Sequence, residues 1–170
     1  IKQGRPDRDR YIANYIQSLR NVGKAGIPVV CYNFMPVVDW TRTNLNLQLE
    51  DGALALAFDM VDFIVFDVFI LRRKGAEAQY ADHLISKAAQ RFESMHAEQR
   101  YELQHTIIAG LPGAEESWTL DQFQQKLDEY CDIDDQKYRQ NLQYFLERVA
   151  PVAEESGVKL AIHPDDPPFS

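Results

Sequence analysis

The sequence lacks several features that would assign it to a common functional class. It has only two cysteines, Cys31 and Cys131, too few for a disulfide framework and not arranged as a paired-cysteine metal motif. Its 18 Lys and Arg are outnumbered by 26 Asp and Glu, a formal net charge of −8. A nucleic-acid binder needs the opposite balance, a basic surface that displaces counterions from phosphates. We therefore expect no nucleic-acid partner.

Long apolar runs are also missing. No stretch approaches the roughly 20 apolar residues that span a bilayer. The first residues carry no apolar leader, so we expect a cytoplasmic protein without a membrane partner. The chain starts at Ile1, and its last, polar residues follow directly on a strand-like run. We expect it to be one domain or part of one, cut from a longer protein.

The same pattern of helix, glycine and short apolar strand occurs near both ends of the chain. Apolar residues recur at helical spacing over residues 7–24 and 135–156. Continuous apolar runs of strand length follow at 27–34 and 158–163. Such runs are typical of strands buried on both faces. The pattern predicts an α/β fold in which two parallel strands follow two helices.

Two details of this repeat can be tested in a structure. Aligning Gly26 with Gly157 places Val29–Cys31 opposite Leu160–Ile162. Pro151 lies inside the second helical pattern and is expected to kink or split the helix, because proline removes a helical hydrogen bond.

The residues between the two units, approximately 44–134, are predicted to form a mainly helical insertion. Helices are predicted at 82–94, at 96–109 and from a capping box at Thr119 to Tyr130. The β-branched and aromatic run 61–71 predicts one or two strands.

Candidate functional residues follow each predicted strand, because ligands of parallel α/β folds bind at the carboxyl ends of strands. His163 ends the second strand and precedes Asp165 and Asp166. An imidazole next to carboxylates suits a divalent metal. The alternative is a structural histidine in a tight turn, with Asp–Pro as ordinary turn chemistry.

Asn33, Trp40 and Arg42 follow the first strand. An arginine can bind a carboxylate through two hydrogen bonds, and the flat apolar face of a tryptophan can pack against a carbon chain. These residues, together with Asp165 and Asp166, are candidate substrate-binding groups for an anionic, polyhydroxylated molecule. The alternative is a surface ion pair of Arg42 with Asp39 and a tryptophan in the core.

Three segments carry a family resemblance. They are CYNFMPVVDWTRT at 31–43, IIAGLPGAEE at 107–116 and HPDDPP at 163–168. In this order the sequence resembles the mannonate dehydratases of the UxuA type over essentially all 170 residues. The resemblance implies a (β/α)8 TIM barrel of the xylose-isomerase-like kind, of which this chain would hold two core parallel strands and a long insertion.

The resemblance also implies an activity and a cofactor. Enzymes of this family dehydrate D-mannonate to 2-keto-3-deoxy-D-gluconate in hexuronate (glucuronate) catabolism with Mn²⁺ or Fe²⁺. By the same resemblance His163 is a metal ligand. The remaining ligands and the acid and base residues are expected beyond Ser170, so residues 1–170 alone are expected to be inactive. A homo-oligomer is also expected.

Two other functions remain open from the sequence. Another metal-dependent sugar or sugar-acid isomerase or epimerase on the same barrel would use similar residues at the strand ends. A non-catalytic interaction protein would instead bind its partner through the surface of the helical insertion.

Overall fold

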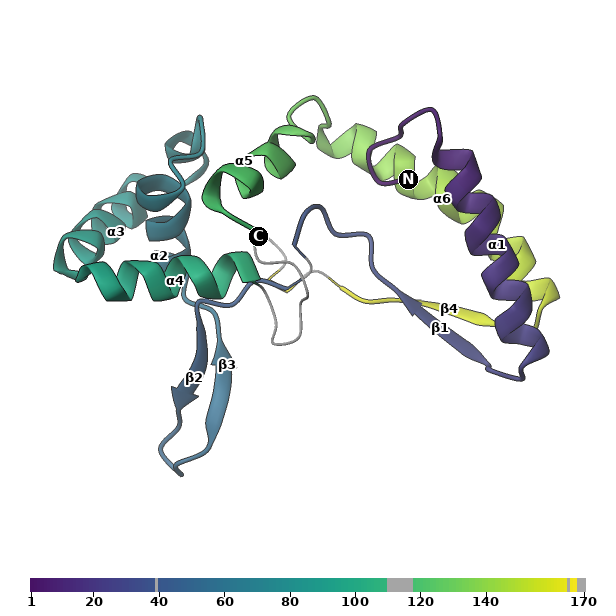
Figure 1. Cartoon of the computed structure of the whole chain (residues 1–170), viewed down its shortest axis with the longest axis horizontal. Helices are drawn as coiled ribbons and strands as arrows, with labels where there is room; N and C mark the ends of the chain where they lie inside the picture. The colour runs from purple at the N-terminus through teal and green to yellow at the C-terminus, as the bar shows by residue number, and fades with distance from the viewer. Residues whose placement is uncertain (39, 110–117, 165, 168–170) are drawn as a thin grey trace. The chain divides into compact units, whose positions relative to one another are not determined.

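The computed structural model describes residues 1–38, 40–109, 118–164 and 166–167 (Figure 1). The chain is a mixed α/β protein with few strands. It divides into two compact units, Ile1–Val37 with Leu127–Asp165 and Val38–Lys126 with Asp166–Ser170. In the described ranges, no helix combines the length and apolar character needed to cross a membrane.

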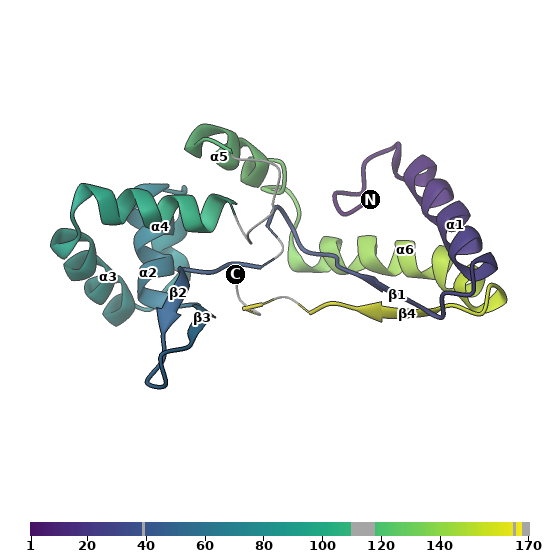
Figure 2. The ribbon, with the colours of Figure 1, turned by 60° about the horizontal axis from the view of Figure 1, so that its bottom comes forward.

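The first unit contains the predicted repeat of helix and strand. Helix α1 (Arg8–Lys24) precedes strand β1 (Val29–Tyr32), and helix α6 (Asp135–Glu155) precedes strand β4 (Lys159–Ile162). The two strands pair in parallel, and the two helices pack together beside them (Figures 1 and 2). The predicted helices and the parallel strand pair are therefore confirmed.

The register of the strands differs by one residue from the glycine alignment. Val29 lies opposite Lys159, and Tyr32 lies opposite Ile162. The amide of Lys159 donates to the carbonyl of Pro28 at 2.9 Å. The glycines determine where each helix ends, whereas hydrogen bonds between neighbouring strands determine the pairing.

Both glycines end their helices in the same way. Gly26 and Gly157 have φ of +76° and +69°, a region that glycine occupies without steric cost. The amide of the next residue, Ile27 or Val158, donates to the carbonyl five residues earlier, at 3.2 Å and 2.8 Å respectively. This is the Schellman motif, which ends the helix and turns the chain into the strand.

The core of this unit lies between the helices and one face of the two strands. Its buried apolar side chains come from α1, α6 and the segments flanking the strands: Ile12, Leu19, Phe34, Phe145, Val149, Ala153 and Val158. Val30 and Leu160 pack partly against it. Val29 remains 49% exposed and Ile162 53% exposed. In the described residues, helices therefore cover one face of the strand pair and leave the other face exposed. Burial on both faces stays a prediction for the longer protein.

Pro151 does not split its helix. It lies inside the continuous 21-residue helix α6. Val149 and Ala153, on either side of it, are at most 2% exposed. Their burial in the core keeps the helix continuous despite the missing amide donor.

Gly23 marks a close approach between α1 and the end of α6. A Cβ atom on Gly23 would lie 2.4 Å from the backbone oxygen of Ser156 and 2.9 Å from its Cβ. Gly23→Ala is expected to destabilise the protein by about 1–3 kcal/mol through overpacking. This loss is expected to exceed what alanine gains over glycine in helix propensity. Urea unfolding measures the change. Arg20→Ala on the exposed side of α1 is the control, with an expected change within about 0.5 kcal/mol, and an equal effect of both would contradict the prediction.

The second unit combines a hairpin with short helices. Its elements are strands β2 (Asn44–Gln48) and β3 (Leu54–Ala57), helices α2 (Met60–Ile64), α3 (Asp82–Ser94) and α4 (Ala97–Ala109), the π-helix η1 (Val65–Ile70) and the 3₁₀ helix η2 (Ala76–Gln79). Helix α5 (Leu120–Asp128) follows. The helices predicted at 82–94 and 96–109 are confirmed.

The predicted capping box at the start of α5 is also confirmed. The amide of Thr119 donates to Gln122 Oε1 at 2.9 Å, and the amide of Gln122 donates to Thr119 Oγ1 at 3.2 Å. These bonds satisfy two amides that the helix start leaves without partners. The helix ends at Asp128, two residues before the predicted end.

The strand prediction for residues 61–71 is wrong. These residues form α2 and η1, and Asp59 caps the start of α2 by accepting from the amide of Asp62 at 2.9 Å. Ile64 and Val65 are fully buried. A short apolar run that is buried all round has the same composition in a helix as in a strand, so residue types alone could not decide.

The hairpin of β2 and β3 was not expected within the helical insertion. Its strands pair antiparallel, and Gly52 turns the chain with φ of +85°. Asp51 Oδ1 accepts from the amide of Ala53 at 2.9 Å. Leucine alternates with polar or small residues on both sides of an Asp–Gly turn, which is the sequence signal for a hairpin.

A buried carboxylate lies in η1. Asp67, 4% exposed, accepts from Arg73 Nε at 2.7 Å and from Arg73 Nη2 at 2.6 Å. The hydroxyl of Tyr80 donates to Asp67 Oδ2 at 2.7 Å. Burial, and then the hydrogen bond to Asp67, raises the pKa of Tyr80, so the hydroxyl remains a donor. This network joins η1 to the segment that follows it.

Candidate functional site at the strand ends

The first group of candidate residues follows β1 and β4 in the first unit. The amide of His163 donates to the carbonyl of Tyr32 at 2.7 Å. Asn33 and His163 are therefore the next residues along two paired parallel strands, at their carboxyl ends. Both are partly buried, and His163 Nδ1 lies 3.3 Å from the carbonyl oxygen of Pro164. The structure thus places two predicted site residues at adjacent positions of the sheet.

Residues distant in the sequence hold the segment that leaves β1. Lys2 Nζ donates to the carbonyl of Met35 at 2.6 Å, and the hydroxyl of Tyr138 donates to the carbonyl of Phe34. Phe34 and Met35 are 8% and 2% exposed. No local sequence pattern points to Lys2 or Tyr138, because these hydrogen bonds join residues at least 33 positions apart.

Two features near this strand end concern Tyr32 and Val37. Burial raises the pKa of Tyr32, which keeps its hydroxyl protonated.

Val37 has φ of +56°, a conformation that is strained for a β-branched residue. Strain of this kind costs on the order of 1–3 kcal/mol.

The second group of candidate residues lies in the second unit. Arg42 Nη2 donates to Asp166 Oδ2 at 2.5 Å, and Arg42 Nη1 donates to the backbone oxygen of Asp166 at 3.2 Å. Trp40 and Asp166 form a parallel β-bridge, in which the amide of Thr41 donates to the carbonyl of Asp166 at 3.2 Å. The structure therefore brings together Trp40, Arg42 and Asp166. Asp39 and Asp165 lie outside the described residues.

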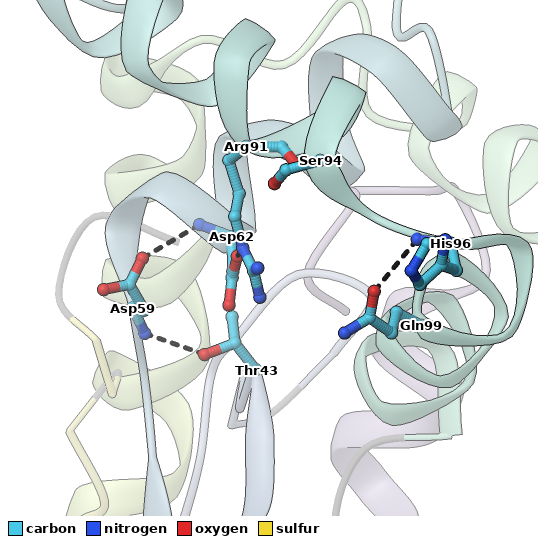
Figure 3. A network of polar contacts seen from close by, with 7 residues as sticks. All are labelled: Thr43, Asp59, Asp62, Arg91, Ser94, His96 and Gln99. Carbon is cyan, nitrogen blue, oxygen red and sulfur yellow. Dashed lines mark hydrogen bonds and ion pairs between the residues drawn. The ribbon is translucent and has the colours of Figure 1, made fainter.

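The threonines beside Arg42 fix its backbone. Thr41 is 1% exposed and Thr43 is 8% exposed. Thr43 Oγ1 accepts from the amide of Asp59 at 2.8 Å, and Asp59 caps α2 (Figure 3). Asp62 in α2 in turn accepts from Arg91 of α3 at 2.8 Å. This network ties the segment that carries Arg42 to the helices of its unit.

The described residues do not by themselves make a metal site. In the part of the chain that the structure describes, no three His, Cys, Asp or Glu side chains are grouped closely enough to hold an ion. Cys31 and Cys131 are both exposed. His96 directly precedes α4, and its amide donates to Gln99 Oε1 at 2.9 Å (Figure 3). Among the residues described, only His163 is both a potential metal ligand and the residue that directly follows a strand of the parallel pair.

Comparison with known proteins identifies the family. The model of the family described as D-mannonate dehydratase (UxuA) matches residues 1–170. Proteins named mannonate dehydratase from Marinomonas sp. (strain MWYL1) and Chromohalobacter salexigens are each 52% identical over 168 residues, which is 99% of this chain and 43% of theirs. The crystal structure of mannonate dehydratase from Streptococcus suis serotype2 matches with a TM-score of 0.60 and 36% identity, covering 99% of this chain and 34% of that chain.

The chain thus spans less than half the length of the curated relatives that it matches. The match nevertheless runs through all three segments on which the resemblance rests, at 31–43, 107–116 and 163–168. The chain belongs to the D-mannonate dehydratase (UxuA) family.

Proposed function

We propose that these residues are part of a longer enzyme that dehydrates D-mannonate to 2-keto-3-deoxy-D-gluconate in hexuronate catabolism in the cytoplasm. The single observation that carries this proposal is the family match over residues 1–170. We further propose a (β/α)8 TIM barrel for the complete enzyme. The parallel pair of β1 and β4, each strand preceded by a helix, supports that architecture.

The reaction removes a proton from C2 and a hydroxide from C3 of the sugar acid. A base takes the C2 proton, and an acid protonates the departing oxygen. In this proposal Asn33, Trp40, Arg42, Asp165 and Asp166 form the substrate-binding site. The position of Asn33 directly after β1 supports its role, because barrel enzymes bind ligands at strand ends. The ion pair of Arg42 with Asp166 supports a polar site at these two residues. The acid and base belong to residues outside this chain.

His163 is proposed to contribute one ligand to a Mn²⁺ or Fe²⁺ ion. Its position directly after β4, fixed by the hydrogen bond to Tyr32, supports this role. Histidine is the commonest metal ligand among protein side chains. The other ligands are proposed to come from the part of the family sequence that this chain does not span.

The activity is tested with the complete enzyme after removal of metal by a chelator. We expect 2-keto acid to form from D-mannonate only after Mn²⁺ or Fe²⁺ is restored, and the product to be lighter than the substrate by one water. A product of unchanged mass would instead indicate an isomerase or epimerase. No turnover with either metal, from folded protein, would contradict the proposal.

We also propose that the complete enzyme is a homo-oligomer and that a second copy covers the hairpin of β2 and β3. The hairpin extends away from the helices of its unit (Figures 1 and 2). Leu47 lies opposite Ala55 and Leu54 lies opposite Gln48, so leucines occur on both faces. Leu47 is 41% exposed and Leu54 65% exposed. A two-stranded hairpin is marginally stable alone, and a two-fold contact would cover the same leucines in both copies.

This contact is tested by the molar mass of the complete enzyme in solution. We expect light scattering to show an oligomer for the wild type and a smaller species for Leu47→Asn combined with Leu54→Asn. Tyr101→Asn, at a 66% exposed tyrosine of α4, is the control and is expected to leave the mass unchanged. A monomeric wild type, or a double variant with unchanged mass, would overturn the proposal.

A further inference from the structure

The ion pair of Arg42 and Asp166 is unequally buried. The side chain of Arg42 is 15% exposed, whereas that of Asp166 is 55% exposed. The guanidinium therefore lies behind the carboxylate, and the carboxylate faces outward. A ligand approaching this pair meets Asp166 first.

The hydrogen bonds of the Arg42 side chain go to the preceding residue, Thr41, and to Asp166. Nη1 donates to the carbonyl of Thr41 at 2.8 Å and to the carbonyl of Asp166 at 3.2 Å. Nη2 donates to Asp166 Oδ2 at 2.5 Å. One arginine thus holds both the main chain and the side chain of Asp166, and the amide of Thr41 adds a third bond to the same residue at 3.2 Å.

These contacts leave the two oxygens of the Asp166 carboxylate in different situations. Within the described residues, the hydrogen bonds to this carboxylate go to Oδ2. Oδ1 keeps its capacity to accept, and a sugar acid carries several hydroxyl donors. A guanidinium that binds a substrate carboxylate would instead present two neighbouring N–H groups outward. In Arg42 both Nη groups already donate within the protein.

We propose that Asp166 accepts a hydrogen bond from a substrate hydroxyl, and that Arg42 is a positioning residue that holds Asp166 in place for it. This inference rests on the proposed dehydratase activity. It gives Arg42 an indirect role, through Asp166, in place of a direct contact with the substrate carboxylate.

The experiment compares Arg42→Met, Asp166→Ala and the double variant in the complete, metal-loaded enzyme with D-mannonate as substrate. Losing a hydrogen bond to a charged group is expected to raise KM by about 10- to 100-fold in each single variant. The kcat is expected to change by less than about 3-fold, because the lost contact serves binding. The double variant is expected to match the worse single variant, because both changes remove the same contact. Arg42→Lys keeps the charge but lacks the planar fork of a guanidinium, so it should give an intermediate KM.

Three other outcomes would decide against the inference. If the two effects on KM multiply, Arg42 contacts the substrate independently of Asp166. If kcat falls while KM stays constant, the pair only maintains the fraction of folded enzyme. An unchanged KM in Asp166→Ala removes Asp166 from the site. Arg139→Met, at an exposed ion pair with Asp135, is the matched control and should behave as wild type. An inactive wild type would contradict the activity itself and is thereby distinguished from failure of this inference.

Discussion

Replacing His163 with alanine is expected to lower the activity of the complete enzyme on D-mannonate by more than about 100-fold. Loss of a residue that supports a metal ligand already costs roughly 10- to 100-fold in metal affinity or activity, so loss of a ligand should cost at least as much. The backbone of this position is held by its amide, which donates to Tyr32 and remains in alanine. The change therefore removes the imidazole without removing the strand pairing.

The measurement has two parts, bound metal and turnover. After dialysis against chelator and reloading with Mn²⁺, the His163→Ala enzyme should retain less metal per subunit than the wild type by elemental analysis. His83→Ala, at an exposed histidine of α3, is the matched control and should keep both metal and activity. A His163→Ala enzyme that binds a full equivalent of metal and turns over normally would show that His163 is a structural histidine.

Much of the fold followed from periodicity in the sequence. Residues 82–94 and 135–155 are helical as predicted, because their apolar side chains recur on one face that packs against neighbours. The strand prediction for residues 61–71 was wrong for the opposite reason. Apart from Asp62 and Asp67 this run is apolar, so it has too few polar positions for a helical period to be recognised.

The candidate site was predictable only in part. The rule that ligands bind at strand ends led to His163, Asn33 and Arg42 as single residues, each from its type and place. The pairing of Arg42 with Asp166 was not predictable, because it joins residues 124 positions apart and competed with a nearby carboxylate, Asp39. Local sequence specifies which side chains follow a strand, but tertiary structure decides which of them meet.

Asp67→Ala is expected to lower the free energy of unfolding by about 3 kcal/mol. Breaking a buried ion pair leaves the other charge without compensation, which typically costs about 3–5 kcal/mol. The lower end applies here because Arg73 keeps 24% of its side chain exposed and can be partly solvated. Tyr80 also loses the acceptor of its hydroxyl. Chemical unfolding of the protein measures the change.

A second ion pair of the same unit provides the matched control. Asp62 and Arg91 bond at 2.8 Å, similar in length to the pair of Asp67 and Arg73, but their side chains are 23% and 43% exposed. Water screens such a pair, so Asp62→Ala should cost less than about 1 kcal/mol. Equal losses from Asp67→Ala and Asp62→Ala would mean that burial does not set the strength of these pairs.

The double variant of Asp67→Ala with Arg73→Met separates the two contributions to the loss. If the penalty comes from the uncompensated charge of Arg73, removing that charge should recover part of the stability lost in Asp67→Ala alone. If it comes from the cavity left by the carboxylate, the double variant should be no more stable than the single one. We expect recovery, because two hydrogen bonds from Arg73 and one from Tyr80 converge on this carboxylate, and the arginine is the only charged partner among them. The arginine that stabilises the native π-helix thus becomes the source of instability once its partner is removed.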